Sequence, residues 1–306
     1  PITVFLRPIM SHTLLTAILT RLGLLLLRAI AWLPSTAQIW FGTLLGKTAY
    51  LLSRKCRTTT TKNISSAFPK LSQEEQQALI TKHFRSLGIG LIEMAVAWWG
   101  SDRRLKTCVT VEGLKHLDHA LEQGNGVILL SAHFTTLEIG GRLLSLFRPL
   151  HAMYRKQDNP LFNQAMVDGR NSFLQSIVEK KDLRGMLRLL KDNQVIWYAM
   201  DQNSSDNSAA FTHFFGIPCS TTTATSKLAQ RSGAVVIPFT TARIGPNNHY
   251  QLTIHPPFSP FPGEDAVEDT QRIMDHFEKE IRKIPEQYLW IHRRFKSQPE
   301  GYPPFY

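Results

Sequence analysis

Residues 127–138 read Val-Ile-Leu-Leu-Ser-Ala-His-Phe-Thr-Thr-Leu-Glu, and this stretch decides the fold class. Its first six residues are apolar or small, which predicts a buried strand. His133 follows the strand directly, and residues 137–147 predict a helix. In open α/β sheets, ligands gather at the carboxyl ends of strands. An imidazole at that place is well positioned to act as a general base.

The alternation of strand and helix continues on both sides of this stretch. Apolar runs predict strands at 109–111, 127–130, 151–154, 195–199, 235–239 and 250–254. Amphipathic stretches predict helices at 114–123, 137–147, 161–174, 184–191, 223–232 and 269–283. Upstream, residues 35–53 and 88–99 are apolar and predict helices. Between them, Ser72 with Glu75 forms a capping box that opens a helix running to about Arg85. The pattern predicts an α/β fold with a central sheet flanked by helices.

The segment 14–33 is apolar except for threonines, one glycine, Arg21 and Arg28. Its twenty residues are just long enough to span a bilayer core of about 30 Å. Eleven Leu and Ile residues favour insertion by about 3–6 kcal/mol in total, and each Arg opposes it by about 2.5–3.5 kcal/mol. The two arginines lie seven residues apart, on one helical face, so a helix in the interface and a tilted span both remain open. We expect residues 1–34 to form a membrane helix and residues 35–306 to form one catalytic domain.

The same segment has two other possible interpretations, a signal peptide and a buried core helix. The run Ala29-Ile30-Ala31 resembles a signal-peptide cleavage site, but Arg28 interrupts the apolar run just before it. A buried core helix is disfavoured because buried arginine needs partners.

The chain carries 35 Lys and Arg against 24 Asp and Glu, a net charge of +11. Such an excess implies an anionic partner: nucleic acid, anionic lipid or an acidic protein. The basic residues are scattered and form no nucleic-acid motif, so we expect no nucleic-acid partner. Several follow the apolar segment, which by the positive-inside rule places the main domain on the cytoplasmic side. The three cysteines lack metal-site spacing, and no metal or redox cofactor is expected.

Glu138 lies five residues after His133. On a helix this offset would point the two side chains about 140° apart, so they do not form a helical metal pair. A loop followed by the first turn of a helix can fold the carboxylate back to the ring, as in the lower half of a Ser-His-Asp triad. No G-x-S-x-G nucleophile is present, so the nucleophile would be a hydroxyl of the substrate.

Further motifs sharpen this interpretation. Residues 129–138 resemble the H-x-x-x-x-D/E motif of glycerolipid-type acyltransferases. Further segments, in the same order along the chain, resemble the late (secondary) acyltransferases of lipid A biosynthesis. They are Met153-Tyr154-Arg155 with Asn159-Pro160, then Arg170, 198–202, 214–218 with Thr221, and 287–296. The resemblance covers nearly the whole chain, from about residue 57 to 296. Met200 before Asp201 and the run 203–205 depart from the usual pattern.

The resemblance implies a function and a set of roles. Members of that family move an acyl group from an acyl carrier protein thioester to a hydroxyl of a lipid A precursor at the inner membrane. His133 would take the proton of that hydroxyl, and Glu138 would fix the ring tautomer. Arg155 and Arg170 would stabilise the oxyanion or bind phosphate. Substrate contacts are also expected at Asp201, which could instead pair with Arg170 or make an Asx-turn, and at Thr221, which could instead cap the next helix.

Three other functions remain open at this point. The same histidine and carboxylate would serve a lysophospholipid or glycolipid acyltransferase with another acceptor. A basic nucleic-acid-binding protein on a membrane tether would show affinity that falls steeply with salt. A non-catalytic lipid-binding protein would keep its function when Glu138 is replaced. Likewise Arg170 could be a surface residue paired with Asp168 or Glu179.

Overall fold

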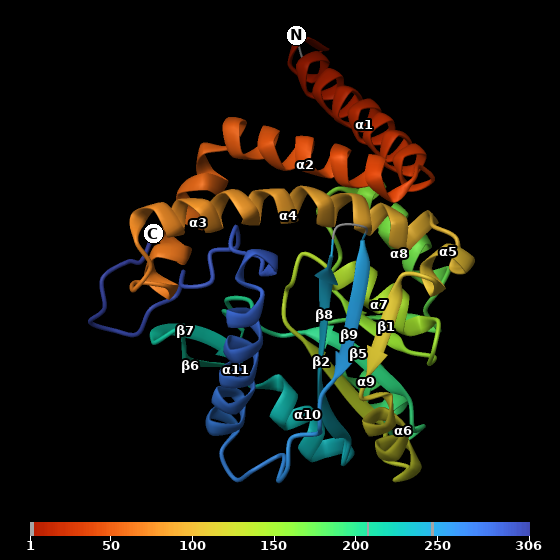
Figure 1. Cartoon of the computed structure of the whole chain (residues 1–306), viewed down its shortest axis with the longest axis vertical. Coiled ribbons are helices and arrows are strands. Elements are labelled where there is room, and N and C mark those ends of the chain that lie inside the picture. The colour runs from red at the N-terminus through yellow and green to blue at the C-terminus, as the bar shows by residue number, and fades with distance from the viewer. Residues whose placement is uncertain (1–2, 207, 246–247) are drawn as a thin grey trace.

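The computed structural model describes residues 3–206, 208–245 and 248–306, and it is built around a seven-stranded sheet (Figure 1). The strand order is β1-β9-β8-β2-β5-β3-β4. Five neighbours from β8 to β4 run parallel, and β9 is antiparallel to β8. The strands are β1 Val109–Glu112, β2 Val127–Ser131, β3 His151–Tyr154, β4 Ser176–Glu179, β5 Val195–Ala199, β8 Val235–Ile244 and β9 His249–Ile254. The predicted α/β class is confirmed.

Helices cover the sheet and cross one end of it. In Figure 1, α4 runs across the end of the sheet toward which the arrowhead of β8 points, and α1 and α2 lie beyond α4. The helices are α1 Thr3–Ala31, α2 Ser35–Leu52, α3 Arg54–Ala67, α4 Gln73–Trp99, α5 Asp102–Lys106, α6 Leu114–Glu122, α7 Leu137–Ser145, α8 Pro160–Asn171, α9 Leu183–Lys191, α10 Ala224–Ser232, α11 Ala266–Lys283 and the 3-10 turn η1 Pro285–Gln287.

One predicted helix pair is a single helix. The capping box at Ser72 and Glu75 is present, but α4 continues without a break from Gln73 to Trp99. It continues because α2 packs against it at very short range: a Cβ at Gly46 would lie 2.1 Å from the carbonyl oxygen of Phe84, and one at Gly88 would lie 2.1 Å from that of Gly42. The glycines therefore serve a close helix–helix contact rather than a chain break.

Several elements escaped the sequence pattern. The polar helix α3 contains four consecutive threonines, which have low helix propensity, and it is held instead by burying Asn63 and Ile64. A separate hairpin pairs β6 (Ala209–Phe214) with β7 (Ile217–Thr222). Its turn, Phe215-Gly216, has positive φ at both residues, as two-residue hairpin turns require.

Helix α1 contains the predicted apolar segment. Among the described residues, its window Leu14–Ala31 is the one stretch long and apolar enough to cross a membrane by length and composition. Only 11 % of that window is buried inside the molecule, which argues against the buried core helix. Residues 1 and 2 of the predicted 1–34 anchor lie outside the described part of the chain.

A buried histidine on α4 predicts how acid affects stability. Burial lowers the pKa of His83 to about 4, against the opposing effect of hydrogen bonds to the carbonyls of Glu286 and Tyr288. The folded-state pKa of His83 lies below the unfolded value of about 6.5. The stability of the fold with a neutral His83 is therefore fully present above pH 6.5, and it is lost as pH falls toward 4. We expect His83→Gln to reduce the pH slope of the unfolding free energy by up to about 1.4 kcal/mol per pH unit in that window. Urea titrations of both proteins between about pH 7 and pH 4.5 measure this; equal slopes would contradict it.

Candidate active site

The site forms where two neighbouring parallel strands end. In the β2–β5 register, Ser131 lies opposite Ala199. His133 and Asp201 each follow two residues later, so equal offsets bring them side by side beyond the sheet. The Nδ1 atom of His133 lies 2.7 Å from Oδ1 of Asp201, and the backbone N–H of His133 donates to the same oxygen at 3.0 Å.

Asp201 is a buried, ionised carboxylate. Burial alone would raise the pKa of Asp201, but the His133 charge, with hydrogen bonds from His133 and Tyr288, lowers that pKa to about 2. An ionised carboxylate accepts only, so Nδ1 of His133 carries the proton and donates it. When the ring is neutral, its lone pair is therefore at Nε2. This arrangement suits a general base.

The segment 287–292 closes behind this pair. Tyr288 donates its hydroxyl to Oδ2 of Asp201 at 2.8 Å, and its pKa is raised well above 10 by burial and by the Asp201 charge, so it remains a donor. The backbone N–H of Leu289 donates to the carbonyl of His133 at 2.9 Å. His292 stays neutral, since burial lowers its pKa to about 4, and its Nε2 accepts from the N–H of Asn203.

Glu138 has a different partner from the predicted one. Its carboxylate accepts two hydrogen bonds from Arg170, at 2.9 and 2.6 Å, and one from Nε1 of Trp98 at 2.7 Å. The ring of His133 is held by Asp201 instead, so the expected contact between Glu138 and the His133 ring is wrong. The reason is that Glu138 lies on the first turn of α7 and points toward α4 and α8, the helices that carry Trp98 and Arg170.

The Glu138–Arg170 pair is largely buried, with side chains 14 % and 13 % exposed. Burial would raise the pKa of Glu138, but the charge and hydrogen bonds of Arg170 hold it below its ordinary value. Arg170 is therefore not a surface residue paired with Asp168 or Glu179. It uses two of its five N–H groups on Glu138 and also lines a cavity, where further donors remain.

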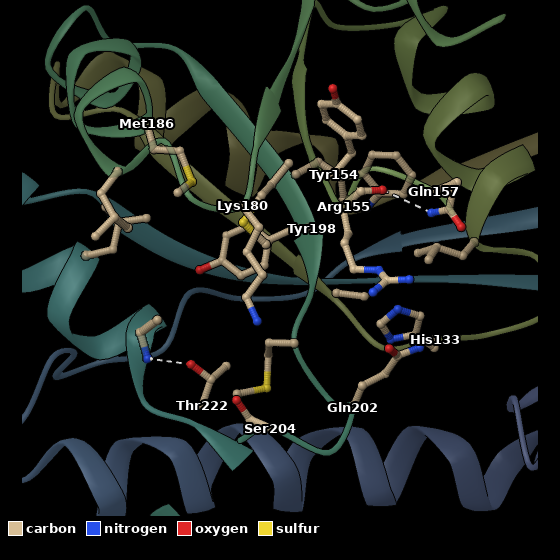
Figure 2. A pocket seen from close by; sticks show the side chains of 18 of the residues that line it. His133, Tyr154, Arg155, Gln157, Lys180, Met186, Tyr198, Gln202, Ser204 and Thr222 are labelled. Carbon is tan, nitrogen blue, oxygen red and sulfur yellow. Dashed lines mark hydrogen bonds between the residues drawn. The ribbon is translucent and has the colours of Figure 1, made fainter. Parts of the chain in front are cut away.

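A cavity of about 660 Å³ opens beside His133 (Figure 2). This volume is typical of sites that bind small molecules or lipid chains. None of its described lining residues is acidic, and four can carry positive charge: His133, Arg155, Arg170 and Lys180. The remaining lining residues are Leu137, Met153, Tyr154, Gln157, Met166, Leu183, Met186, Trp197, Tyr198, Ala199, Met200, Gln202, Asn203, Ser204, Thr222, Ala224 and Leu228. The cavity thus combines a cationic region with a long apolar surface.

Two of its cations come from loops at the strand ends. Arg155 follows β3, and in Figure 2 its guanidinium points toward the ring of His133. It is largely exposed and makes an ion pair with Asp158 at 3.4 Å. Lys180 follows β4 and pairs with Asp206 at 3.3 Å. Both lie where an anionic or electron-rich group of a substrate would be attracted.

Two predicted substrate contacts are corrected. Asp201 is absent from the cavity lining; it neither pairs with Arg170 nor makes an Asx-turn contact, because its oxygens are used by His133 and Tyr288. Thr221 is buried in β7, where its hydroxyl contacts Thr212 and Arg294, and it does not cap α10. Its neighbour on the other strand face, Thr222, lines the cavity instead, as alternation along a strand requires.

Some contacts within the site could not be recognised from the sequence, although Asp201 itself was expected to contact substrate. Asp201 and Tyr288 were both within quoted motifs, but nothing in those motifs joined them to His133. His133 and Asp201 lie at the same distance in sequence from the ends of β2 and β5. This spacing predicts their contact only when β2 and β5 are known to be neighbours. The partner role of Trp98 had no sequence signal beyond its aromatic type.

Comparison with known proteins identifies close relatives. Residues 9–297 match the model of the family described as bacterial lipid A biosynthesis acyltransferase. The chain is 36 % identical to the lipid A biosynthesis lauroyltransferase of Escherichia coli K12 over 94 % of each chain. It is 35 % identical to the palmitoleoyltransferase of the same organism over 92 % of each, and 23 % identical to its myristoyltransferase over 92 % of this chain and 87 % of that one.

Proposed function

The chain belongs to the family of bacterial lipid A biosynthesis acyltransferases, and from that premise we propose that it transfers a fatty acyl group from an acyl carrier protein thioester to a hydroxyl of a lipid A precursor. The observation that carries the proposal is the Asp201–His133 pair beside the cavity: an imidazole that a buried carboxylate orients and that itself lines the cavity. A lipid hydroxyl is the nucleophile that such a base activates.

The proton path follows from the tautomer. Nε2 of His133 removes the proton of the acceptor hydroxyl, and the resulting oxygen attacks the thioester carbonyl carbon. Asp201 stabilises the imidazolium that forms, through the 2.7 Å contact at Nδ1. When the C–S bond breaks, the imidazolium returns its proton to the leaving thiolate. General-base catalysis of this type contributes about 10²–10⁴-fold.

The negative charge on the tetrahedral intermediate needs a donor. Arg155 points toward His133 and Arg170 lines the same cavity, so both support this role. Arg170 is the better fixed of the two, because Glu138 holds it in a bidentate pair. In this proposal Glu138 is a positioning residue that acts through Arg170. A lost oxyanion donor typically costs about 2.7–4 kcal/mol.

The apolar part of the cavity supports binding of an acyl chain. Met186 of α9 lies on the opposite side of the cavity from His133 in Figure 2. We expect Met186→Phe to shift the preferred donor to shorter chains, and Met186→Ala to longer ones, each changing the ratio of kcat/KM values by about 10-fold. Assays with a series of acyl donors measure this. Leu187→Ala is the control, since Leu187 is absent from the lining; unchanged selectivity in both Met186 variants would contradict the acyl assignment.

Membrane attachment is proposed on two further observations. The window Leu14–Ala31 of helix α1 is apolar and largely exposed, and Thr20 in it accepts a hydrogen bond from Asn159 at the start of α8, the helix that carries Arg170. A second cavity, of about 420 Å³, is lined by Arg54, Lys55, Thr58, Thr59, Lys62, Arg293 and Tyr306. Arg54 in this lining follows shortly after the exposed Leu51 and Leu52 at the end of α2. We propose that residues 1–34 anchor the chain and that this basic face binds anionic lipid headgroups on the cytoplasmic side of the inner membrane.

The basic face predicts charge-dependent binding to membranes. Neutralising Arg54, Lys55 and Lys62 to Gln removes about 1 kcal/mol per residue, so partition onto vesicles with anionic lipid should fall about 10²-fold. The control variant neutralises the exposed Lys227, Arg231 and Lys279 on α10 and α11, which changes the net charge equally. Co-sedimentation with anionic and neutral vesicles measures the effect, and equal losses in the two variants would contradict a localised headgroup site.

One assay tests the proposed reaction. The purified chain is incubated with an acyl carrier protein thioester and a lipid A precursor, and the product is weighed by mass spectrometry. A mass gain of one acyl group that depends on His133 supports the proposal. Acylation of lysophospholipids but not of the lipid A precursor would assign another acceptor, and binding without turnover would leave a lipid-binding protein.

A further inference from the structure

A cluster of two histidines and a glutamate lies apart from the cavity, between α11 and the end of β9. His276 and Glu280 are four residues apart on α11, so they share one face of the helix. His255 comes from the residue after β9, and its ring packs edge-on against His276 with ring centroids 4.6 Å apart. One ligand atom from each of the three residues lies within 4.8 Å of the others.

The hydrogen bonds of the two histidines leave each ring a nitrogen for a cation. Nε2 of His276 is buried and has no hydrogen-bond partner among the described residues. Nε2 of His255 is held by the hydroxyl of Thr240 at 3.0 Å. When the Thr240 hydroxyl accepts from Nε2–H, the lone pair of His255 is at Nδ1. A hydrogen bond at the other ring nitrogen is the usual way in which metal-binding histidines are oriented.

We propose that His255, His276 and Glu280 bind a zinc-like divalent cation that links α11 to the sheet. Two imidazoles and one carboxylate are a ligand set that zinc uses, with water at the fourth position. The ligand atoms of a tetrahedral zinc lie roughly 3.3–3.5 Å apart, so binding would draw the three side chains together by about an ångström. The inference is independent of the proposed acyl transfer.

One cation already competes for this site. The ammonium of Lys283 lies 2.8 Å from both carboxylate oxygens of Glu280. The side chain of Lys283 is 58 % exposed and that of Glu280 is 11 % exposed, so solvent screens the ammonium end of the pair and weakens the attraction. A metal ion would displace the ammonium into solvent. The competition makes a clear prediction: removing Lys283 should strengthen metal binding, whereas removing any of the three ligands should weaken it.

The site would brace the segment that completes the active site. Helix α11 ends at Lys283, η1 follows directly, and Tyr288 then donates to Asp201. On the other side, His255 donates its backbone N–H to the carbonyl of Pro238 in β8. A cation at the cluster would therefore connect the central sheet to the helix that leads into Tyr288.

The test uses the untagged full chain in detergent, with Zn²⁺ titrated against a chromophoric chelator and Co²⁺ used as a spectroscopic probe. We expect one ion per chain, a visible Co²⁺ spectrum typical of four-coordinate geometry, and a rise in Tm with Zn²⁺. His276→Ala and Glu280→Gln should each weaken binding by at least about 10–100-fold, and Thr240→Val by about 10-fold. Lys283→Ala should tighten it several-fold.

His119→Ala is the matched control, because His119 pairs with Glu122 on an exposed helix surface and offers only two ligands. Circular dichroism of each metal-free variant identifies any that fails to fold; Glu280→Gln, which keeps side-chain size, then carries the comparison. The proposal is overturned if Zn²⁺ binds the parent chain no more tightly than His276→Ala, or if His119→Ala weakens binding as much. It is also overturned if Lys283→Ala leaves the affinity unchanged while the ligand variants have no effect.

Discussion

Replacing Asp201 with asparagine is expected to lower kcat by about 10³–10⁴-fold with little change in KM. Asparagine has the same shape but carries a neutral amide. It can turn its NH₂ toward the ring, which then presents Nδ1 as an acceptor and leaves the proton on Nε2, the wrong tautomer for a base. The imidazolium formed during the reaction would also lose the buried negative charge now 2.7 Å from Nδ1. The measurement is steady-state kinetics on the acyl-transfer assay.

The control for Asp201→Asn is Asp192→Asn. Asp192 is exposed at the end of α9, shortly before β5 begins, so it lies at the opposite end of the same strand from Asp201. It should retain nearly full activity. Tyr288→Phe should lose less than Asp201→Asn, because it removes one donor to the carboxylate and leaves the charge. If Asp201→Asn stays within about 10-fold of the parent, Asp201 does not orient the base.

Separating Glu138 from Arg170 is expected to reduce both stability and activity. Glu138→Gln and Arg170→Gln each leave one partner of a largely buried pair without its counter-charge, which typically costs about 3–5 kcal/mol. Each should also lower kcat by about 10²–10³-fold, because the positioned guanidinium is the better fixed donor for the oxyanion. Urea unfolding and kinetics on the same preparations measure the two effects.

The double variant distinguishes the two roles that Glu138 can have. When both residues are changed to Gln, no buried charge is left unpaired, so part of the lost stability should return while activity stays low. If Glu138 acted directly on His133, Arg170→Gln would leave kcat nearly unchanged while Glu138→Gln would not. Equal losses in the two single variants support action through Arg170.

Local features of the sequence predicted well because each depends on residues close together in the chain. The capping box at Ser72 and Glu75 is such a feature. The strands 151–154 and 195–199 were predicted with the bounds that the structure shows. The local sequence did not predict helix α3, because its stability comes from the burial of Asn63 and Ile64 and not from the helix propensity of its residues.

The sequence by itself determined that a histidine ends a buried strand in an α/β fold, that a long apolar helix precedes the strands, and which family the motifs resemble. These depend on contiguous residues and their periodicity. Only the tertiary structure decided which carboxylate holds the histidine. Glu138 is five positions away from His133 and Asp201 is sixty-eight, yet the sheet order places β5 beside β2, and the start of α7 turns Glu138 toward Arg170. Which side chains meet at a strand end depends on which strands are neighbours, and the strand order is set by packing of the whole chain.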